Sequence, residues 1–311
     1  MTRAEEGAVT GQSMGVGIVG LGSIGLSIAR NVVDAGHDVT VFDPRPEPGV
    51  ELARHGATVA PSVDALARVC EVVLVVVGND RQLVEVVQGA RGRPGLAEAL
   101  AERSVVVVHS TVHPDTVVGL AAELATKAID LVDAPVSGPD GAEAAGRRKD
   151  LTFMVGAEVD VLERVRPVLA ASGPRILHLG AVGAGQLVKL AANAMTLVLM
   201  EVTRESLRLV KQAGLDPGVA LEVWKDTSGN SWAVENWHAM QALASRHPGG
   251  PAGLSALGFK DLDHVLALAR RYEAPLPLAA LVTQLMEHRL GEVSAALTTP
   301  GAGPRDLLGG R

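Results

Sequence analysis

The stretch that decides the fold is Val16-Gly17-Ile18-Val19-Gly20-Leu21-Gly22-Ser23-Ile24-Gly25, near the start of a chain of 311 residues. It begins as a short aliphatic run and continues as Gly-x-Gly-x-x-Gly, a pattern that joins a strand to a helix. Glycines let the backbone approach a pyrophosphate, and the N–H groups at a helix N-terminus favour negative charge. The stretch therefore predicts a dinucleotide site built from Gly20, Gly22, Ser23, Ile24 and Gly25.

The end of the next aliphatic run predicts which dinucleotide is bound. Asp43 stands there, and its carboxylate can accept hydrogen bonds from both adenosine ribose hydroxyls while repelling a 2′-phosphate. Arg45 follows two residues later, either as a solvated loop charge or as a partner for a 2′-phosphate. We therefore predict NAD as the cofactor, with NADP as the alternative.

The rest of the chain has two different characters. Aliphatic runs separated by helical patterns predict an α/β domain with a mostly parallel sheet. These runs are Val16–Val19, Val39–Phe42, Val72–Val77, Val105–Val108, Ile129–Val132 and Ile176–Leu179. After Gly180 no strand-like run follows, and Ala184–Gln212 is typical of one long, mostly buried helix. We expect a dinucleotide-binding domain at 14–181, an all-α domain at 182–298 built on this helix, and flexible tails at 1–13 and 299–311.

Composition limits the partners. A formal net charge of −7 argues against nucleic acid, because phosphate binding needs a basic face. The longest apolar stretch lies between Lys189 and Glu201, and it is too short and too interrupted by Asn193 to span a bilayer. The N-terminus lacks the apolar region of a signal peptide. We expect a cytoplasmic protein without a membrane partner. The apolar surface of the long helix exceeds what one small domain covers, which predicts a homodimer or homotetramer.

Four segments resemble the β-hydroxyacid dehydrogenase family, and they span residues 16 to about 280. Besides the nucleotide fingerprint they are Asp133-Ala134-Pro135-Val136-Ser137-Gly138, Gly183-Ala184-Gly185-Gln186-Leu187-Val188-Lys189 with Asn193, and Lys260-Asp261-Leu262. The resemblance implies a Rossmann-like domain followed by a helical domain, a catalytic lysine, and a substrate carboxylate bound near the serine. The implied reaction is hydride transfer between the nicotinamide and a small β-hydroxy acid or its semialdehyde, similar to 3-hydroxyisobutyrate.

Lys189 and Asn193 are the predicted catalytic pair. Their spacing of four residues puts both on one face of the long helix. In this interpretation Lys189 exchanges a proton with the substrate hydroxyl, and Asn193 holds the lysine or the substrate. A lysine serves as an acid and base only where burial or a nearby positive charge lowers its pKa, and oxidised nicotinamide supplies such a charge.

The substrate-binding prediction comprises Ser137, Gly138, Lys260 and Trp232. A hydroxyl and free backbone N–H groups in a turn after a strand are good carboxylate donors. We expect Lys260 at a helix entry, with Asp261 as a first-turn charge or N-cap. Lys260 resembles the family's second lysine, which implies a place near both cofactor and substrate; without the resemblance it would be a solvated lysine. Trp232 belongs to a group of three tryptophans that either packs between helices or forms a wall of the substrate pocket.

Asn79 and Thr111 are predicted to border the cofactor, Thr111 near the nicotinamide ribose, although each could be an ordinary loop residue. Pro139 replaces a usual family glycine. The basic run Arg147–Lys149, in a segment longer than its family equivalent, either is solvated or attracts an anionic substrate. We predict no metal at His109 and His113, because Pro114 prevents a shared helix face.

Two other functions use the same architecture. An imine reductase is disfavoured by Lys189, which that family usually lacks at the equivalent place. A non-catalytic dinucleotide-binding assembly protein could lose Lys189, Asn193 and Ser137, and all three are present.

Overall fold

The computed structural model describes residues 14–246 and 250–289, apart from the side chains of 287–289, so both predicted tails lie outside the described residues. The chain divides into two compact units, Met1–Lys189 and Leu190–Arg311. The division falls inside the long helix, a few residues after the boundary predicted from the sequence.

Unit 1 is built on a parallel sheet, as the aliphatic runs predicted. Its parallel strands lie in the order β3-β2-β1-β4-β7-β8. They span Gly15–Val19 (β1), Asp38–Phe42 (β2), Thr58–Val59 (β3), Val72–Val75 (β4), Val105–Val108 (β7) and Asp130–Asp133 (β8). Every residue of β4 and β7 is buried, which fits runs of valine and leucine without polar alternation.

Three further strands extend this sheet beyond β8: β9 (Val136–Ser137), β10 (Thr152–Gly156) and β11 (Arg175–Gly180). Strand β10 runs antiparallel to β8 and β9 and parallel to β11. Strand β10 was not predicted, because its apolar run is only Phe153–Val155 between a threonine and a glycine. The small hairpin of β5 (Gly89–Ala90) and β6 (Arg93–Pro94) was not predicted either.

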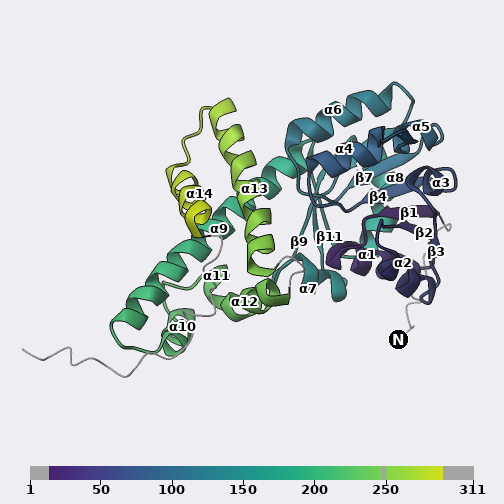
Figure 1. The fold of residues 1–311 in the computed structure, drawn as a ribbon. Coiled ribbons are helices and arrows are strands. Elements are labelled where there is room, and N and C mark those ends of the chain that lie inside the picture. The colour runs from purple at the N-terminus through teal and green to yellow at the C-terminus, as the bar shows by residue number, and fades with distance from the viewer. Residues whose placement is uncertain (1–13, 247–249, 290–311) are drawn as a thin grey trace, which may run out of the picture. The chain divides into compact units, whose positions relative to one another are not determined.

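Helices cover both faces of the sheet (Figure 1). One core contains residues of α1 (Ser23–Asp34), α2 (Pro46–Ala53), α7 (Ala142–Arg147) and α8 (Val159–Ala170). The other contains residues of α3 (Val63–Ala67), α4 (Asp80–Gln88), α5 (Leu96–Ala99) and α6 (Pro114–Ala125). A sheet covered in this way keeps its ligand sites at the carboxyl ends of its strands.

Unit 2 is helical throughout its described residues, as predicted. Helix α9 (Ala184–Gln212) runs from unit 1 into unit 2. The helices that follow are α10 (Pro217–Lys225), α11 (Trp232–Glu235), α12 (Trp237–Arg246), α13 (Gly250–Arg271) and α14 (Pro277–Arg289). Side chains of α9 pack against α10 to α12 around Leu207, and against α13 and α14 around Leu262. None of the described helices is apolar over a length that would cross a membrane.

The predicted bounds of α9 are confirmed, but its predicted burial is wrong for a single copy of the chain. Met195, Val202 and Leu209 are 67%, 50% and 70% exposed. The other helices of unit 2 pack on only part of its circumference, so an apolar stripe of α9 stays open to solvent.

Candidate active site

In unit 1, the residues predicted to bind the cofactor and the substrate carboxylate lie along one edge of the sheet. Strands β1, β2, β4, β7 and β8 are parallel, so their carboxyl ends meet at the same edge. The residues that follow these ends include Gly20, Asp43, Asn79, Thr111 and Ser137. This edge is where an open α/β sheet binds its ligands.

The glycine turn has the space that a pyrophosphate needs. A Cβ on Gly25 would lie 2.0 Å from the Gly20 carbonyl oxygen, so only glycine lets the helix start this close to the strand. A Cβ on Gly22 would meet nothing within 4 Å. Gly22 and Ser23 are exposed at the start of α1, with no side chain capping that helix N-terminus. The turn therefore fits the phosphates of a dinucleotide, which a side chain at Gly22 would displace.

Asp43 and Arg45 form a pair beside this turn. Asp43 Oδ2 accepts a hydrogen bond of 2.7 Å from the Leu21 N–H, which ties the glycine turn to the end of β2. Asp43 Oδ1 accepts from the Arg45 backbone N–H and from Arg45 Nε, each at 2.9 Å. Burial alone would raise the pKa of Asp43, but the bonds from Arg45 and Leu21 outweigh it and lower that pKa. The side chain of Asp43 is 5% exposed and that of Arg45 is 55% exposed, so the guanidinium is the group open to a ligand.

Asn79 and Thr111 lie in loops, as predicted, and the structure adds what holds these loops. Asn79 is the N-cap of α4, where its side chain accepts from the Gln82 N–H. The loop around Thr111 is fixed by Gln186, a fully buried residue at the start of α9. Gln186 Oε1 accepts from the Val112 N–H at 3.1 Å, and its Nε2 donates to the Ser110 carbonyl at 3.0 Å.

Asp133 anchors the start of α9 and was not recognised from the sequence as a functional residue. Its Oδ1 accepts from the Gly183 N–H and its Oδ2 from the Gln186 N–H, both at 2.8 Å. A Cβ on Gly185 would lie 2.7 Å from Asp133 Oδ2, which explains the glycine at that place in the helix. Burial raises the pKa of Asp133 to about 6, against the hydrogen bonds that lower it. The segment from Gly183 to Gln186 is therefore held against the end of β8.

His109 is a second buried titratable group near this edge. The carbonyl of Ala134 can only accept, so His109 Nδ1 donates to it, at 2.7 Å, and Nε2 carries no proton in the neutral ring. Burial lowers the pKa of His109 to about 4. His113 is the N-cap of α6, and the described residues contain no group of three or more His, Cys, Asp or Glu side chains that could hold a metal.

Ser137 lies in the short strand β9 rather than in a simple turn. It pairs with Thr152 of β10, so the strand missed from the sequence is what places it. The basic run beyond it is neutralised: Arg147 pairs with Glu143, Arg148 with Asp140 and Lys149 with Asp34. These ion pairs leave little net charge to attract an anionic substrate, which favours the solvated interpretation of the run.

In unit 2, hydrogen bonds bring together three polar residues of the candidate site. Asn193 Nδ2 donates to Asp261 Oδ2 at 2.6 Å, and Lys260 Nζ donates to Asp261 Oδ1 at 2.8 Å. Asp261 therefore orients the predicted site residues on two different helices. Lys189 lies one turn before Asn193 on α9.

One prediction for unit 2 needs correction. Lys260 and Asp261 do not begin a helix; they lie in the middle of α13, where Asp261 is buried. Gly258 of the same helix packs against α9: a Cβ there would lie 3.0 Å from Leu197 Cδ2. Trp232 begins α11 and does not line the pocket described next, whereas Trp237 does.

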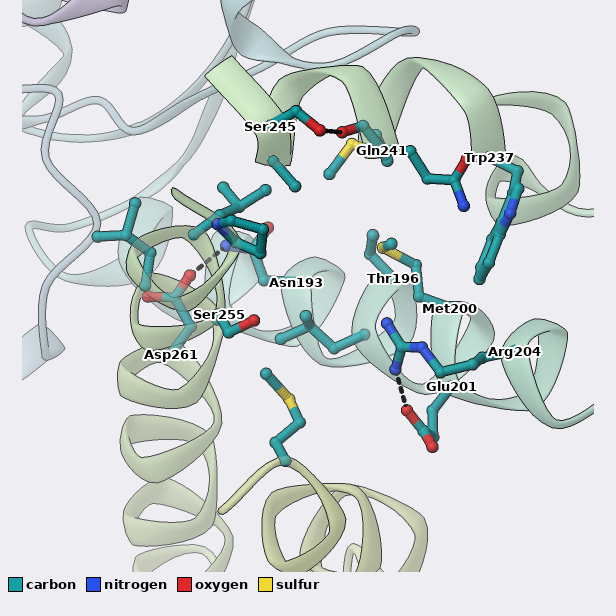
Figure 2. A pocket seen from close by; sticks show the side chains of 18 residues that line it. Asn193, Thr196, Met200, Glu201, Arg204, Trp237, Gln241, Ser245, Ser255 and Asp261 are labelled. Atoms are coloured by element: carbon teal, nitrogen blue, oxygen red, sulfur yellow. Dashed lines mark hydrogen bonds and ion pairs between the residues drawn. The ribbon is translucent and has the colours of Figure 1, made fainter. Parts of the chain in front are cut away.

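A pocket of about 290 Å³ lies within unit 2, between α9, α12 and α13, with Met286 of α14 completing its wall. Figure 2 shows Asn193 and Asp261 at one end of it, and Trp237, Arg204 and Glu201 at the other. Arg204 is ion-paired with Glu201. The pocket thus begins at a predicted catalytic residue and extends along α9.

Comparison with known proteins agrees with this arrangement. Residues 15–183 match the family described as the NAD binding domain of 6-phosphogluconate dehydrogenase. Residues 183–297 match the family described as NAD-binding of NADP-dependent 3-hydroxyisobutyrate dehydrogenase.

Individual relatives cover almost the whole chain. A 3-hydroxyisobutyrate dehydrogenase of Pseudomonas aeruginosa is 36% identical over 87% of this chain and 90% of its own length. A 2-(hydroxymethyl)glutarate dehydrogenase of Eubacterium barkeri is 33% identical over 89% of each. The crystal structure of a 3-hydroxyisobutyrate dehydrogenase from Salmonella typhimurium matches with a TM-score of 0.79 and 29% identity, over 91% of this chain and 98% of that one. The chain therefore belongs to the β-hydroxyacid dehydrogenase family and is an NAD(P)-dependent dehydrogenase.

Proposed function

We propose that this enzyme oxidises a small β-hydroxy acid to its semialdehyde, or reduces the semialdehyde, with Lys189 as the general acid and base. The observation that carries the proposal is the fixed geometry of α9. Asp133 and Gln186 hold the first turn of the helix, and Lys189 follows within the next turn. A general base must be held within hydrogen-bond distance of the proton that it removes, so a fixed position is its first requirement.

The chain's own residues divide the chemistry between them. In the oxidation, Lys189 Nζ takes the proton of the substrate hydroxyl as the hydroxyl carbon becomes a carbonyl. A bound nicotinamide would supply the acceptor for the hydride that this carbon loses. Asn193, oriented by its bond to Asp261, holds the lysine or the substrate. In the reduction, Lys189 returns the proton to the same oxygen.

The carboxylate of the substrate is held by charge-assisted hydrogen bonds. The donors that we assign are the Ser137 hydroxyl, the Gly138 N–H and the Lys260 ammonium. Asp261 pairs with Lys260 and so keeps its ammonium in one place. Fixing the anion orients the hydroxyl carbon, so these donors affect the rate as well as the binding.

The same proposal includes the localisation, the oligomeric state and the cofactor preference of the enzyme. We expect a cytoplasmic homodimer or homotetramer that prefers NAD and has a small anionic substrate. The exposed apolar residues of α9 support the oligomer, because an apolar stripe of this kind is seldom left open to water.

The test of the lysine is the Lys189→Met variant, measured with 3-hydroxyisobutyrate and either cofactor. We expect kcat to fall at least about a hundredfold, the lower bound for a positioned acid and base, with cofactor affinity close to wild type. Lys211→Met, in the last turn of the same helix, is the matched control and should keep wild-type turnover. A kcat of Lys189→Met within about tenfold of wild type would remove the lysine from the mechanism.

A further inference from the structure

We infer that the substrate of this enzyme carries an apolar arm on its α-carbon, longer than a methyl group, which lies in the pocket along α9. The inference rests on the proposed function, which puts Asn193 beside the reacting part of the substrate. Asn193 also lines the pocket (Figure 2), so a chain that leaves the α-carbon past this residue enters the pocket directly.

The pocket has the size and the walls for such an arm. Its volume of about 290 Å³ is roughly twice that of an apolar cavity that holds benzene. The methyl group of 3-hydroxyisobutyrate would leave most of this space unfilled. Its walls include Leu197, Met200, Met240, Leu254 and Met286. Methionine side chains adapt to flexible apolar ligands because they are unbranched and polarisable.

The charged residues of the pocket, Glu201, Arg204 and Asp261, do not favour a charged arm. At the near end the Asn193 amide is bound to Asp261. At the far end the Arg204 guanidinium is ion-paired with Glu201, which is 4% exposed. This pair brings no net positive charge, so a second carboxylate at the end of the arm would meet a buried acid as well as a base.

Helix α9 separates this pocket from its exposed apolar stripe. With 3.6 residues per turn, Asn193, Met200 and Arg204 lie on the side of the helix opposite Met195, Val202 and Leu209. A second copy of the chain that covers the stripe would therefore leave the α9 wall of the pocket unchanged. We assign the pocket to the substrate rather than to a subunit contact.

The first experiment uses the wild-type enzyme and three acids that differ only in the arm. These are 3-hydroxyisobutyrate with a methyl arm, 2-(hydroxymethyl)hexanoate with a butyl arm, and 2-(hydroxymethyl)glutarate with an arm that ends in a carboxylate. Each buried methylene is worth up to about fourfold in binding, so we expect kcat/KM for the butyl arm to exceed that for the methyl arm at least about tenfold. The glutarate should react less well than the hexanoate.

The second experiment fills the pocket. Ala244 lines it on α12, whereas Ala256 is exposed on α13 and does not line it. Ala244→Phe should lower kcat/KM for the hexanoate at least about tenfold and leave that for 3-hydroxyisobutyrate within about twofold. Ala256→Phe should change neither. The thermal midpoint of each variant reports on folding, and the wild-type comparison does not depend on either variant.

The outcomes separate this inference from the proposed function. If kcat/KM for 3-hydroxyisobutyrate equals that for the hexanoate, the inference of a longer apolar arm is wrong and the proposed function stands. If the glutarate is the best of the three, the arm is charged and the inference is overturned. An Ala244→Phe variant that lowers both rates equally would show that the arm does not lie in this pocket. If none of the three acids is oxidised, the proposed function itself fails.

Discussion

Asp43 and Arg45 are the two residues that we expect to share the choice of cofactor. The aspartate carboxylate is almost covered, and its oxygens already accept from Arg45 and from the glycine turn. In the predicted cofactor site, a ribose hydroxyl has to displace the exposed guanidinium to reach Asp43, which should weaken the predicted preference for NAD. A 2′-phosphate would contact the exposed Arg45 guanidinium, which attracts it, but would also lie close to the Asp43 carboxylate, which repels it.

We predict that Arg45→Ala raises the ratio of kcat/KM for NAD to that for NADP, and that Asp43→Ser lowers it. Most of each change should be in KM, because the 2′ position is remote from the reacting carbon and contributes uniform binding. Asp43→Ser should also weaken both cofactors, since it releases the glycine turn from β2. Wild-type enzyme that prefers NADP would show that Arg45 decides, contrary to our prediction.

His109 and Asp133 give the stability of unit 1 two opposite dependences on pH. The pKa of His109 is about 4 in the folded protein against an ordinary 6.5, so its contribution is lost as pH falls through that window. The pKa of Asp133 is about 6 against an ordinary 3.8, so its contribution is lost as pH rises through its own window. Between pH about 4 and about 6 the two effects oppose each other.

Replacing either residue should reveal the pH dependence of stability that the other one causes. In His109→Asn, the free energy of unfolding should fall relative to wild type as pH rises from about 4 to about 6, because Asp133 then titrates without the opposing effect of His109. In Asp133→Asn it should rise over the same range. Each slope should approach about 1.4 kcal/mol per pH unit, the value for one proton. Urea unfolding at a series of pH values measures both; slopes equal to wild type in both variants would contradict these pKa shifts.

At the scale of elements, the sequence correctly predicted those strands and helices whose position follows from a local sequence pattern. The valine runs of β4 and β7 and both ends of α9 follow from periodicity and from the glycines around them. Strand β10 could not be predicted in this way, because its position depends on pairing with β8 and β9 rather than on its own short apolar run. The hydrogen bonds of Asp133, Gln186 and Asp261 were not predicted either. These residues lie in the family's sequence motifs, but their hydrogen-bond partners are distant in sequence.

The open stripe of α9 predicts how copies of the chain associate. Met195, Val202 and Leu209 recur at intervals of seven residues, which keeps them in line along the helix. Val202→Glu should shift the enzyme toward a monomer of about 32.1 kDa in light scattering at micromolar concentration. Val159→Glu is the matched control: it puts the same change at an exposed valine of unit 1 and should not alter the mass. A wild-type monomer, or dissociation by both variants, would contradict the predicted interface.

At the scale of the whole molecule, the net charge of −7 makes the local donors decisive for an anionic substrate. The chain has no general attraction for a carboxylate, and the basic run near Ser137 is neutralised by ion pairs. The predicted site residues are divided between the two compact units: Ser137 belongs to unit 1, and Asn193 and Lys260 belong to unit 2.

Hydride transfer from the hydroxyl carbon is tested most directly with 3-hydroxyisobutyrate that is deuterated at that carbon. The wild-type enzyme should convert NAD or NADP to its reduced form, and mass spectrometry should find one deuterium in the nicotinamide ring of each molecule formed. The semialdehyde should appear in equal amount. Failure to form reduced nicotinamide from this acid or its longer-armed analogues, or reduced nicotinamide without deuterium, would contradict the proposed reaction.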